Sequence, residues 1–444
     1  MGELPADQVA EPHGAGTARS GLALVLAATA IAGISGYAIT WMVPRVIGFA
    51  EYTNFAVFWS LLFFIASALS GIQQEITRGT APSAVAEVAQ PRTRARTTVF
   101  ALGAAAIVLL VVVSTSTLWG RAFSEASDEL FWPLAVGASS SVFVAALTGT
   151  LYGARRWKAI FSIVVIEASI RLAAVGIALA LGASNAVLAW AVVLPFPFAF
   201  VVVALASRRA LAGTRLDVGY RRLTWNVART IAAAASMGVM VSGFPFVLAF
   251  TAGAESSEAL GLVVIASTLV RAPLIVTAMA LQSYLIVFFR ERRSAILRPF
   301  LVIEVGVLAA GVLLGVVGWL AGPAVFAVLF PGQPIPPGAF IGVLVFSSAV
   351  LACLCVSAPA VLARAAHTAY TAGWLLAAVV TIALLMLPIG FMERTTCALL
   401  LGPVAGLLVH TSAIVLASRG AEPGTASRTP ASGDAPAGPS ATTP

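Results

Sequence analysis

The stretch RRALAGTRLDVGYRRLTWNVAR, residues 208–229, decides how this sequence is organised. It holds six arginines and a single acid, Asp217, in a chain that is only 10% charged. About six long apolar runs lie on each side of it. Anionic lipid and the membrane potential both hold such a basic loop on the cytoplasmic side of a membrane. The stretch therefore predicts a cytoplasmic linker between two similar membrane-embedded halves.

The bulk composition indicates a polytopic membrane protein. The 444 residues are 60% hydrophobic, with a mean hydropathy of +0.98, which leaves too little polar surface to cover a soluble core. Backbone polar groups in hydrocarbon must be hydrogen-bonded within the spanning element, and the apolar runs are continuous rather than alternating, so the spans are helices. The predicted fold is all-α, with about twelve transmembrane helices in two pseudo-symmetric six-helix bundles.

The charge pattern excludes several other classes of protein. The net charge of +8 and the isoelectric point near 10.1 come from arginines in short loops between apolar runs, which argues against a nucleic-acid partner. Cys353, Cys355 and Cys397 lie in apolar runs with no histidine or acid at ligand spacing, so we expect no metal site. The sequence also has no phosphate-cradling nucleotide motif, and we expect no cofactor.

The order of segments predicts five regions. We expect a disordered cytoplasmic tail at 1–20, a first bundle at 21–207, the basic linker at 208–229, a second bundle at 230–418 and a disordered cytoplasmic tail at 419–444. The first span is predicted at about 21–43, the second at about 55–72, the seventh at about 231–251 and the eighth at about 260–289.

The loops alternate in charge. Those on the Arg208 side hold nearly all the arginines, whereas the opposite loops hold Arg45, Arg121 and Arg394 together with most of the acids. With an even number of crossings, this pattern predicts a multi-pass protein of the cytoplasmic membrane with both termini in the cytoplasm. Membrane lipids are then direct partners.

A weak internal repeat supports two parallel halves. Aligning Pro44 with Pro245 also matches Val46 with Val247 and Phe49 with Phe250. An even number of crossings in each repeat relates the halves by an axis along the membrane normal, and such transporters hold the substrate path between the halves.

The segments VPRVIGFAEYTNFAVFWSLLF (43–63) and GIQQEITR (71–78) resemble the first two helices of polysaccharide flippases in the multidrug/oligosaccharidyl-lipid/polysaccharide (MOP) exporter superfamily. The resemblance is sharpest over residues 36–78 and weaker over 245–284. It implies two six-helix bundles in a V shape. It also implies a non-enzymatic activity, the transfer of a lipid-linked oligosaccharide or related glycolipid to the outer leaflet by alternating access, with glycan-assembly enzymes as further partners.

Arg271 is the foremost candidate substrate-binding residue. It lies near the middle of its span, where an arginine costs roughly 2.5 to 3.5 kcal/mol, and Pro273 should loosen the helix beside it. One interpretation places Arg271 in a central cavity, where its guanidinium binds phosphate or pyrophosphate of a lipid carrier. The other is a structural ion pair with Glu167.

Further polar residues within the spans are candidates for the cavity. Glu167 and Arg171 are four residues apart, so they share a helix face and can neutralise each other. Alternatively the pair lines the cavity and exchanges partners, with Glu167 accepting a proton during transport. Gln282 and Tyr284, further along the eighth span, are also candidate cavity residues.

A second polar group lies at the cytoplasmic ends of the spans. Polar residues at the ends of spans commonly anchor helices at the membrane–water interface. The same residues could also form a cytoplasmic gate. The candidate gate consists of Gln73, Gln74, Glu75, Arg78, Arg290 and Glu304, and we expect Glu304 to pair with nearby arginines.

Three alternatives to a flippase stay open. A drug or small-molecule exporter of the same superfamily is the first, although cation-coupled exporters usually carry an acid in the first or seventh span and this chain has none there. A membrane-embedded glycan ligase or polymerase is the second, although the outer loops are short and show no paired carboxylates. A non-transporting scaffold with a flippase-like fold is the third.

Overall fold

A computed structural model describes residues 13–80, 95–120, 122–123, 127–211, 216–253, 255–292 and 295–419. Helices are the principal elements of these ranges. In chain order they are α1 (His13–Thr80), α2 (Thr97–Ser114), α3 (Ser116–Trp119), α4 (Ser127–Gly153), α5 (Trp157–Ala180), α6 (Asn185–Val193), α7 (Pro195–Leu211), α8 (Tyr220–Val241), α9 (Phe244–Thr251), α10 (Ser257–Glu291), α11 (Leu297–Leu329), α12 (Gly338–Ala363), α13 (His367–Leu385) and α14 (Phe391–Arg419).

The number of crossings agrees with a twelve-helix membrane fold. Within the described ranges, nine helices are long and apolar enough to cross a membrane, and two bent pairs raise the count to eleven. One bent pair is α8 with α9, and the other is α10 on either side of Pro273. α1 is one of the nine helices, but it has two arms, and each arm is longer than the roughly 20 residues that one crossing needs. α1 can therefore cross the membrane twice. The predicted all-helical membrane fold is therefore confirmed.

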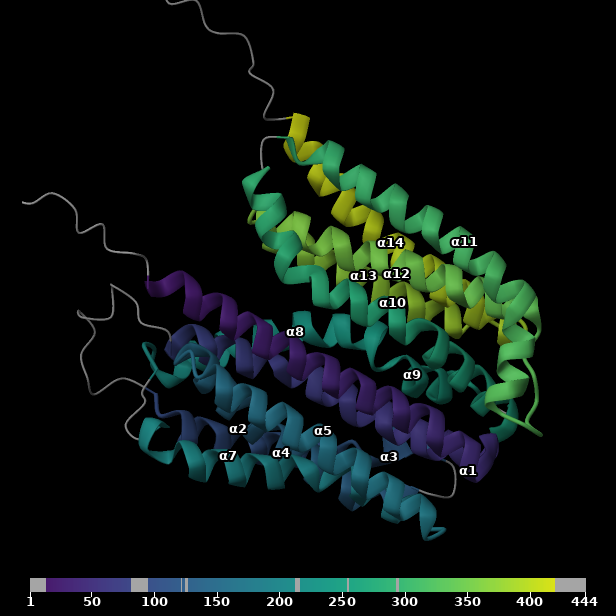
Figure 1. Cartoon of the computed structure of the whole chain (residues 1–444), viewed down its shortest axis with the longest axis horizontal. Coiled ribbons are helices and arrows are strands. Elements are labelled where there is room, and N and C mark those ends of the chain that lie inside the picture. The colour runs from purple at the N-terminus through teal and green to yellow at the C-terminus, as the bar shows by residue number, and fades with distance from the viewer. Residues whose placement is uncertain are drawn as a thin grey trace, which may run out of the picture.

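The two arms of α1 meet at a single residue, Gly48. Its φ of 80° and ψ of 169° lie in a region that is essentially restricted to glycine. Because this one residue makes the break, the second arm begins directly after it, where the sequence predicted a loop before about residue 55. Figure 1 shows the two arms of α1, in purple, lying side by side.

α1 is the axis about which the two halves pack. In the first half it contacts α4 and α5, and α4 in turn packs on α2, α6 and α7. In the second half α12 packs on α10, α11 and α14, while α13 packs on α14. α1 also contacts α8, α9 and α10, so the purple helix in Figure 1 lies between the blue elements and the green and yellow ones.

The molecule has a basic end and an opposite end. Arg155 and Arg156, between α4 and α5, lie at the basic end, as do Arg221 and Arg222 at the start of α8. The opposite end holds the Gly48 break and the turns that precede α6, α10 and α12. Gly21 packs against Trp157, and the Arg364 side chain donates to the Ala417 carbonyl, so both ends of the described chain lie at the basic end.

Two helices begin earlier than predicted. α8 begins at Tyr220, within the predicted linker, because its first turns are amphipathic: Leu223 and Val227 are buried against the first half, whereas Arg221 and Arg222 are exposed. α1 begins at His13, within the predicted tail. Residues 1–12 and 420–444 and the predicted loop arginines Arg121 and Arg215 lie outside the described residues.

Substitution of Gly48 tests the hairpin of α1. We expect Gly48→Ala to lower the free energy of unfolding by about 1 to 3 kcal/mol, because alanine is strained at this φ and ψ. Thermal unfolding in detergent measures the change. Gly36→Ala is the matched control, since a Cβ at Gly36 meets nothing within 4 Å. Equal unfolding midpoints for the two variants would contradict this role of Gly48.

Candidate functional site

The break between α8 and α9 forms one wall of an internal cavity. The two helices bend by 73°, and Pro245 lies in the first turn of α9, where proline is tolerated. Ser60 of α1 fixes this break, because its hydroxyl donates to the Ser242 carbonyl over 2.7 Å and accepts from the Phe246 N–H over 3.1 Å. One small side chain of the first half therefore satisfies two backbone groups that the broken helix leaves free.

A second bend forms the facing wall. α10 bends by 42° between its segment ending at Arg271 and the segment that begins at Pro273, as the proline predicted. The bend places Arg271 beside the α8–α9 break, since its Nη2 donates to the Met240 carbonyl over 3.1 Å.

The cavity between these walls has a volume of about 250 Å³. It lies between the halves, and its lining is aromatic and hydroxyl-bearing with one charged side chain, that of Arg271. The first-half lining comes from α1 and the second-half lining from α8, α9, α10 and the break; the principal residues are Thr40, Tyr52, Phe55, Trp59, Ser60, Phe63, Ser242, Phe244, Pro245, Ser267, Thr268, Arg271 and Val276.

Arg271 is buried without an acidic partner. The residue is 5% exposed, and its guanidinium lies 5.1 Å from the ring centroid of Phe244. Its Nε has no hydrogen-bond acceptor, and no ion pair joins it to a carboxylate in the described part of the chain. A ring and one carbonyl compensate a buried guanidinium only in part, so this side chain retains capacity to bind an anion.

Arg171, in contrast, is fully engaged. It forms an ion pair with Glu167 one turn earlier on α5, and its Nε donates to the Val192 carbonyl over 3.2 Å. Its guanidinium also lies between two rings, 5.2 Å from the centroid of Phe63 and 4.8 Å from that of Phe196. Neither Arg171 nor Glu167 lines the cavity. Phe63 does line it, and Arg171 packs against the ring of Phe63. The structure therefore contains the Glu167–Arg171 ion pair, and it contains no Glu167–Arg271 pair.

Gln282 and Tyr284 lie beyond the cavity. They follow the last lining residue of α10, Val276, toward the basic end. Gln282 is half-buried, whereas Tyr284 is 64% exposed and its ring packs against Phe288 with 6.0 Å between centroids. A role for them in binding stays a prediction.

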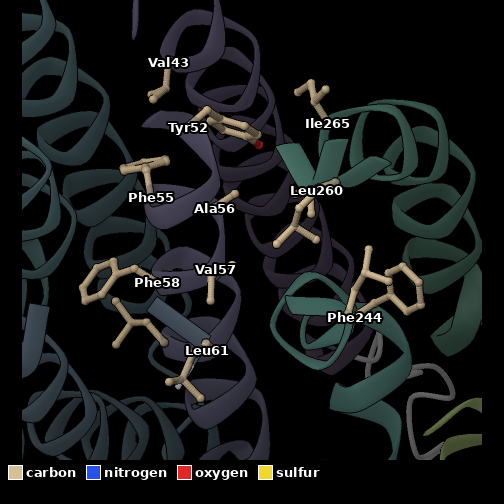
Figure 2. Packing of buried hydrophobic residues seen from close by; sticks show 14 of the residues in the cluster. Val43, Tyr52, Phe55, Ala56, Val57, Phe58, Leu61, Phe244, Leu260 and Ile265 are labelled. Carbon is tan, nitrogen blue, oxygen red and sulfur yellow. The ribbon is translucent and has the colours of Figure 1, made fainter. Parts of the chain in front are cut away.

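The opposite end of the cavity is closed by contacts between the halves. The Phe49 ring packs on Phe326 and Phe330 of α11, with centroid distances of 6.2 and 5.5 Å. The Phe49 N–H donates to the Gln333 side-chain oxygen over 3.1 Å, and Arg45 donates to the Leu329 carbonyl over 2.9 Å. Figure 2 shows the neighbouring apolar contact, in which side chains of the purple α1, among them Tyr52, face Leu260 of α10 and Phe244 of α9.

Close backbone approach completes the seal. A Cβ at Gly261 of α10 would lie 2.2 Å from the Phe49 carbonyl oxygen, so only glycine fits there. The Thr53 hydroxyl next to it donates to the Ser257 carbonyl over 2.7 Å. Together these contacts hold α10 against α1 at the opposite end.

The candidate gate residues do not form one group. Glu75 pairs with Arg78 over 3.0 Å and accepts from Thr230 of α8 over 3.3 Å, which links the two halves. The Gln73 side chain accepts from Thr148 of α4 over 3.2 Å, and Gln74 is exposed. The gate stays a prediction.

Arg290 and Glu304 lie apart from the other gate candidates. Arg290 is exposed near the end of α10. Glu304 is 6% exposed, and neither of its carboxylate oxygens has a hydrogen-bond partner among the residues with described positions. The expected pairing of Glu304 with arginines is therefore not found there. Its main chain lies against α12, whose Cys353 donates to the Glu304 carbonyl over 3.8 Å.

Few features of the sequence point to the hydroxyls and rings that line the cavity. Ser60 and Ser242 are small polar residues in apolar spans, and such residues are common in membrane helices. The one local signal was the Ser-Gly pair at 242–243 followed by Pro245, which predicts a helix break. The four-residue spacing of Trp59 and Phe63 predicts a shared helix face, but only the packing of α8, α9 and α10 shows that this face borders a cavity.

Comparison with known proteins finds related sequences in mycobacteria. Over 408 residues the chain is 33% identical to the uncharacterised protein Rv1510 of Mycobacterium tuberculosis strain H37Rv, covering 89% of this chain and 92% of the relative. Over 416 residues it is 30% identical to the uncharacterised protein Rv3630 of the same strain, covering 90% and 93%. No family model matches the sequence.

Solved structures with a similar fold are membrane transporters. The lipid II flippase MurJ in an inward closed conformation has a TM-score of 0.67 at 10% identity, covering 90% of each chain. The inward-facing conformation of a multidrug resistance MATE family transporter of the MOP superfamily has a TM-score of 0.65 at 12% identity, covering 90% of this chain and 98% of that one. Its outward-facing counterpart has a TM-score of 0.60 at 14% identity, covering 91% and 96%. At these identities the likeness shows the fold alone.

Two matched substitutions separate the roles of the buried arginines. We expect Arg171→Met to lower the free energy of unfolding by about 3 kcal/mol, because it leaves the largely buried Glu167 carboxylate, 16% exposed, without a partner. We expect Arg271→Met to leave stability unchanged or raise it, because no carboxylate loses its partner. Thermal unfolding of both variants in detergent gives the comparison. If Arg271→Met is the more destabilising change, Arg271 is a structural residue.

Proposed function

Because this chain belongs to the family of the mycobacterial proteins Rv1510 and Rv3630 and has the fold of the MOP exporter superfamily, we propose that it is a flippase for a lipid-linked glycan. The substrate head group enters the cavity between the halves, where the Arg271 guanidinium binds its phosphate. The lipid tail stays in the surrounding bilayer. Nothing in this step makes or breaks a covalent bond.

The unpaired guanidinium of Arg271 carries the proposal. A charge that is retained in the membrane interior without an acidic partner indicates a ligand, because an apolar side chain of the same size would be cheaper to bury. An anionic phosphate supplies the missing countercharge through two parallel N–H donors. The rings of Trp59 and Phe63, whose centroids are 4.6 Å apart on α1, give the attached sugar an apolar surface to stack on.

The contacts between the halves support alternating access. The seal at the opposite end joins α1 to α10, to α11 and to the turn after α11 through a few rings, hydrogen bonds to Leu329 and Gln333 and one tight glycine contact. Such an interface can open as a unit when the halves rock about α1, and opening it would expose the cavity to the opposite end. The substrate is released there if it binds the closed form more tightly than the open form.

Orientation follows from the loops. We place the protein in the cytoplasmic membrane. The basic end carries most of the arginines, so this end and both termini face the cytoplasm. The substrate then enters from the cytoplasmic leaflet, where lipid-linked sugars are assembled, and glycan-assembly enzymes are its expected partners.

A drug exporter is the second candidate, since the structural neighbours include multidrug transporters. The positive charge of Arg271 in a cavity lined by no acid repels organic cations, which makes cationic drugs poor substrates. A glycan ligase or polymerase has less support, because the described cavity lining offers neither paired carboxylates nor a histidine for acid–base chemistry.

Lipid analysis of a deletion strain tests the proposed function. We expect loss of the gene to cause a polyprenyl-linked glycan to build up, as mass spectrometry of membrane lipids would detect. Wild-type protein should restore the normal profile, and Arg271→Met should fail to do so at equal protein level. A normal lipid profile together with altered drug tolerance would point to the exporter instead.

Substitution of Gly261 tests the seal. We expect Gly261→Ala to hold the opposite end partly open, because its Cβ cannot lie 2.2 Å from the Phe49 carbonyl oxygen. Spin labels on Glu51 and Ile335, which are exposed in different halves, should then show a longer distance in pulsed electron resonance. Gly306→Ala is the control, since nothing lies within 4 Å of its added Cβ. An unchanged distance in Gly261→Ala would contradict the assignment of this contact as the seal.

A further inference from the structure

The cavity contains one uncompensated positive charge. Arg271 is the single charged residue in its described lining. The next buried arginine of the spans, Arg171, lies behind the Phe63 ring, and the Glu167 carboxylate neutralises it. The Glu304 carboxylate lies on α11 and does not line the cavity. The charge available to a bound anion is therefore that of one guanidinium.

The hydroxyls around Arg271 are neutral, so none of them can neutralise a second negative charge. Those of Tyr52, Ser242 and Thr268 donate to no acceptor in the described structure, whereas three others are engaged. Thr40 donates its hydroxyl proton to the Gly36 carbonyl, Ser267 donates to the Val264 carbonyl and Ser60 donates to the Ser242 carbonyl. Each of these oxygens can still accept a hydrogen bond, but its proton is already engaged. They suit the hydroxyl groups of a sugar better than the oxygens of a second phosphate.

On this basis we propose that the cavity is built for a sugar or polyol joined to its lipid through one phosphate, a phosphodiester, and not through a pyrophosphate. This inference rests on the proposed flippase function and specifies its substrate class. A phosphodiester carries one negative charge at neutral pH, which the Arg271 guanidinium neutralises. A pyrophosphate diester carries two, and the second charge would be buried without a partner, which is strongly unfavourable in an apolar site.

The aromatic face of α1 fits the same substrate. Phe55, Trp59 and Phe63 follow one another at helical spacing, with ring centroids 5.9 and 4.6 Å apart, and all three line the cavity. The Arg271 guanidinium lines the same cavity from α10, so the cavity presents one cation and one aromatic surface. A single sugar phosphate presents the complementary pair of surfaces, an anionic group and a ring with an apolar face.

Competition binding to the purified full-length protein in dodecyl maltoside tests this assignment. The labelled probe is undecaprenyl phosphate mannose, and the competitors are undecaprenyl pyrophosphate N-acetylglucosamine and phosphatidylinositol. We expect the mannosyl phosphodiester to bind at least about tenfold more tightly than the pyrophosphate lipid. Arg271→Met should weaken the phosphodiester at least about tenfold, and Arg222→Met, an exposed arginine of α8 outside the cavity, should leave it unchanged.

A variant with a second charge makes the test independent of Arg271. Val276 lines the cavity and is 44% exposed, so Val276→Lys can carry a charge there without full burial. We expect this variant to reduce the preference for the phosphodiester by about tenfold, because the added ammonium neutralises the second charge of the pyrophosphate.

The outcomes distinguish this inference from the proposed function. Equal or tighter binding of the pyrophosphate lipid by the wild-type protein, lost in Arg271→Met, overturns the phosphodiester assignment and leaves the flippase proposal standing. Failure of every lipid to bind through Arg271 overturns both. If phosphatidylinositol binds as tightly as the polyprenyl lipid, the phosphodiester assignment holds and the carrier is a glycerolipid.

Discussion

A charged side chain among membrane helices must be neutralised by the protein or by something that the protein binds. The two buried arginines differ in how far the protein itself neutralises them. Arg171 lies against Glu167, a carbonyl and two rings, so its charge is satisfied within the first half. Arg271 has one carbonyl and one ring, and it borders a cavity. The difference between these two environments, rather than the presence of arginine in a span, is the reason for assigning the candidate site to Arg271.

The rest of the fold holds Arg271 at the junction of the two halves. The α8–α9 break and the α10 bend both leave backbone groups free near the cavity, and Ser60 from the first half satisfies two of them. At the opposite end, Gly48 lets α1 reverse direction and Gly261 lets α10 approach it. The same helix therefore forms the wall of the cavity, the seal beside it and the contact between the halves. In the proposed transport cycle, this shared helix would couple motion of the halves to occupancy of the cavity.

The sequence predicted the features that depend on composition and spacing. Apolar runs and loop arginines are sufficient to derive the helical membrane fold, and Pro273 is sufficient to expect a bend beside Arg271. The Glu167–Arg171 pair also follows from a four-residue spacing. By contrast, the single-residue turn at Gly48 was read as a loop, because the backbone angles that permit it are not visible in an apolar sequence. The first turns of α8 were predicted as part of the linker, because they contain several arginines and the burial of Leu223 and Val227 depends on contacts with the first half.

Contacts between distant segments were beyond sequence reasoning. Ser60 and Ser242 are 182 residues apart, and neither is unusual in its own span. The expected pairing of Glu304 assumed that proximity along the chain to the arginines at 290–293 implied contact, but the carboxylate oxygens of Glu304 have no partner in the described structure. The position of a side chain around its helix decides such contacts, and a nearly uniform apolar span gives no periodic signal from which to read it.

Contact between the Arg271 guanidinium and a substrate phosphate is the central claim, and solid-state nuclear magnetic resonance can measure it directly. Protein with nitrogen-15 arginine, frozen in dodecyl maltoside with bound undecaprenyl phosphate mannose, contains phosphorus only in the substrate. The account predicts nitrogen–phosphorus dipolar dephasing in the wild-type protein that disappears in Arg271→Met. Dephasing of equal size in both proteins would contradict it, because the phosphate would then lie against a different arginine.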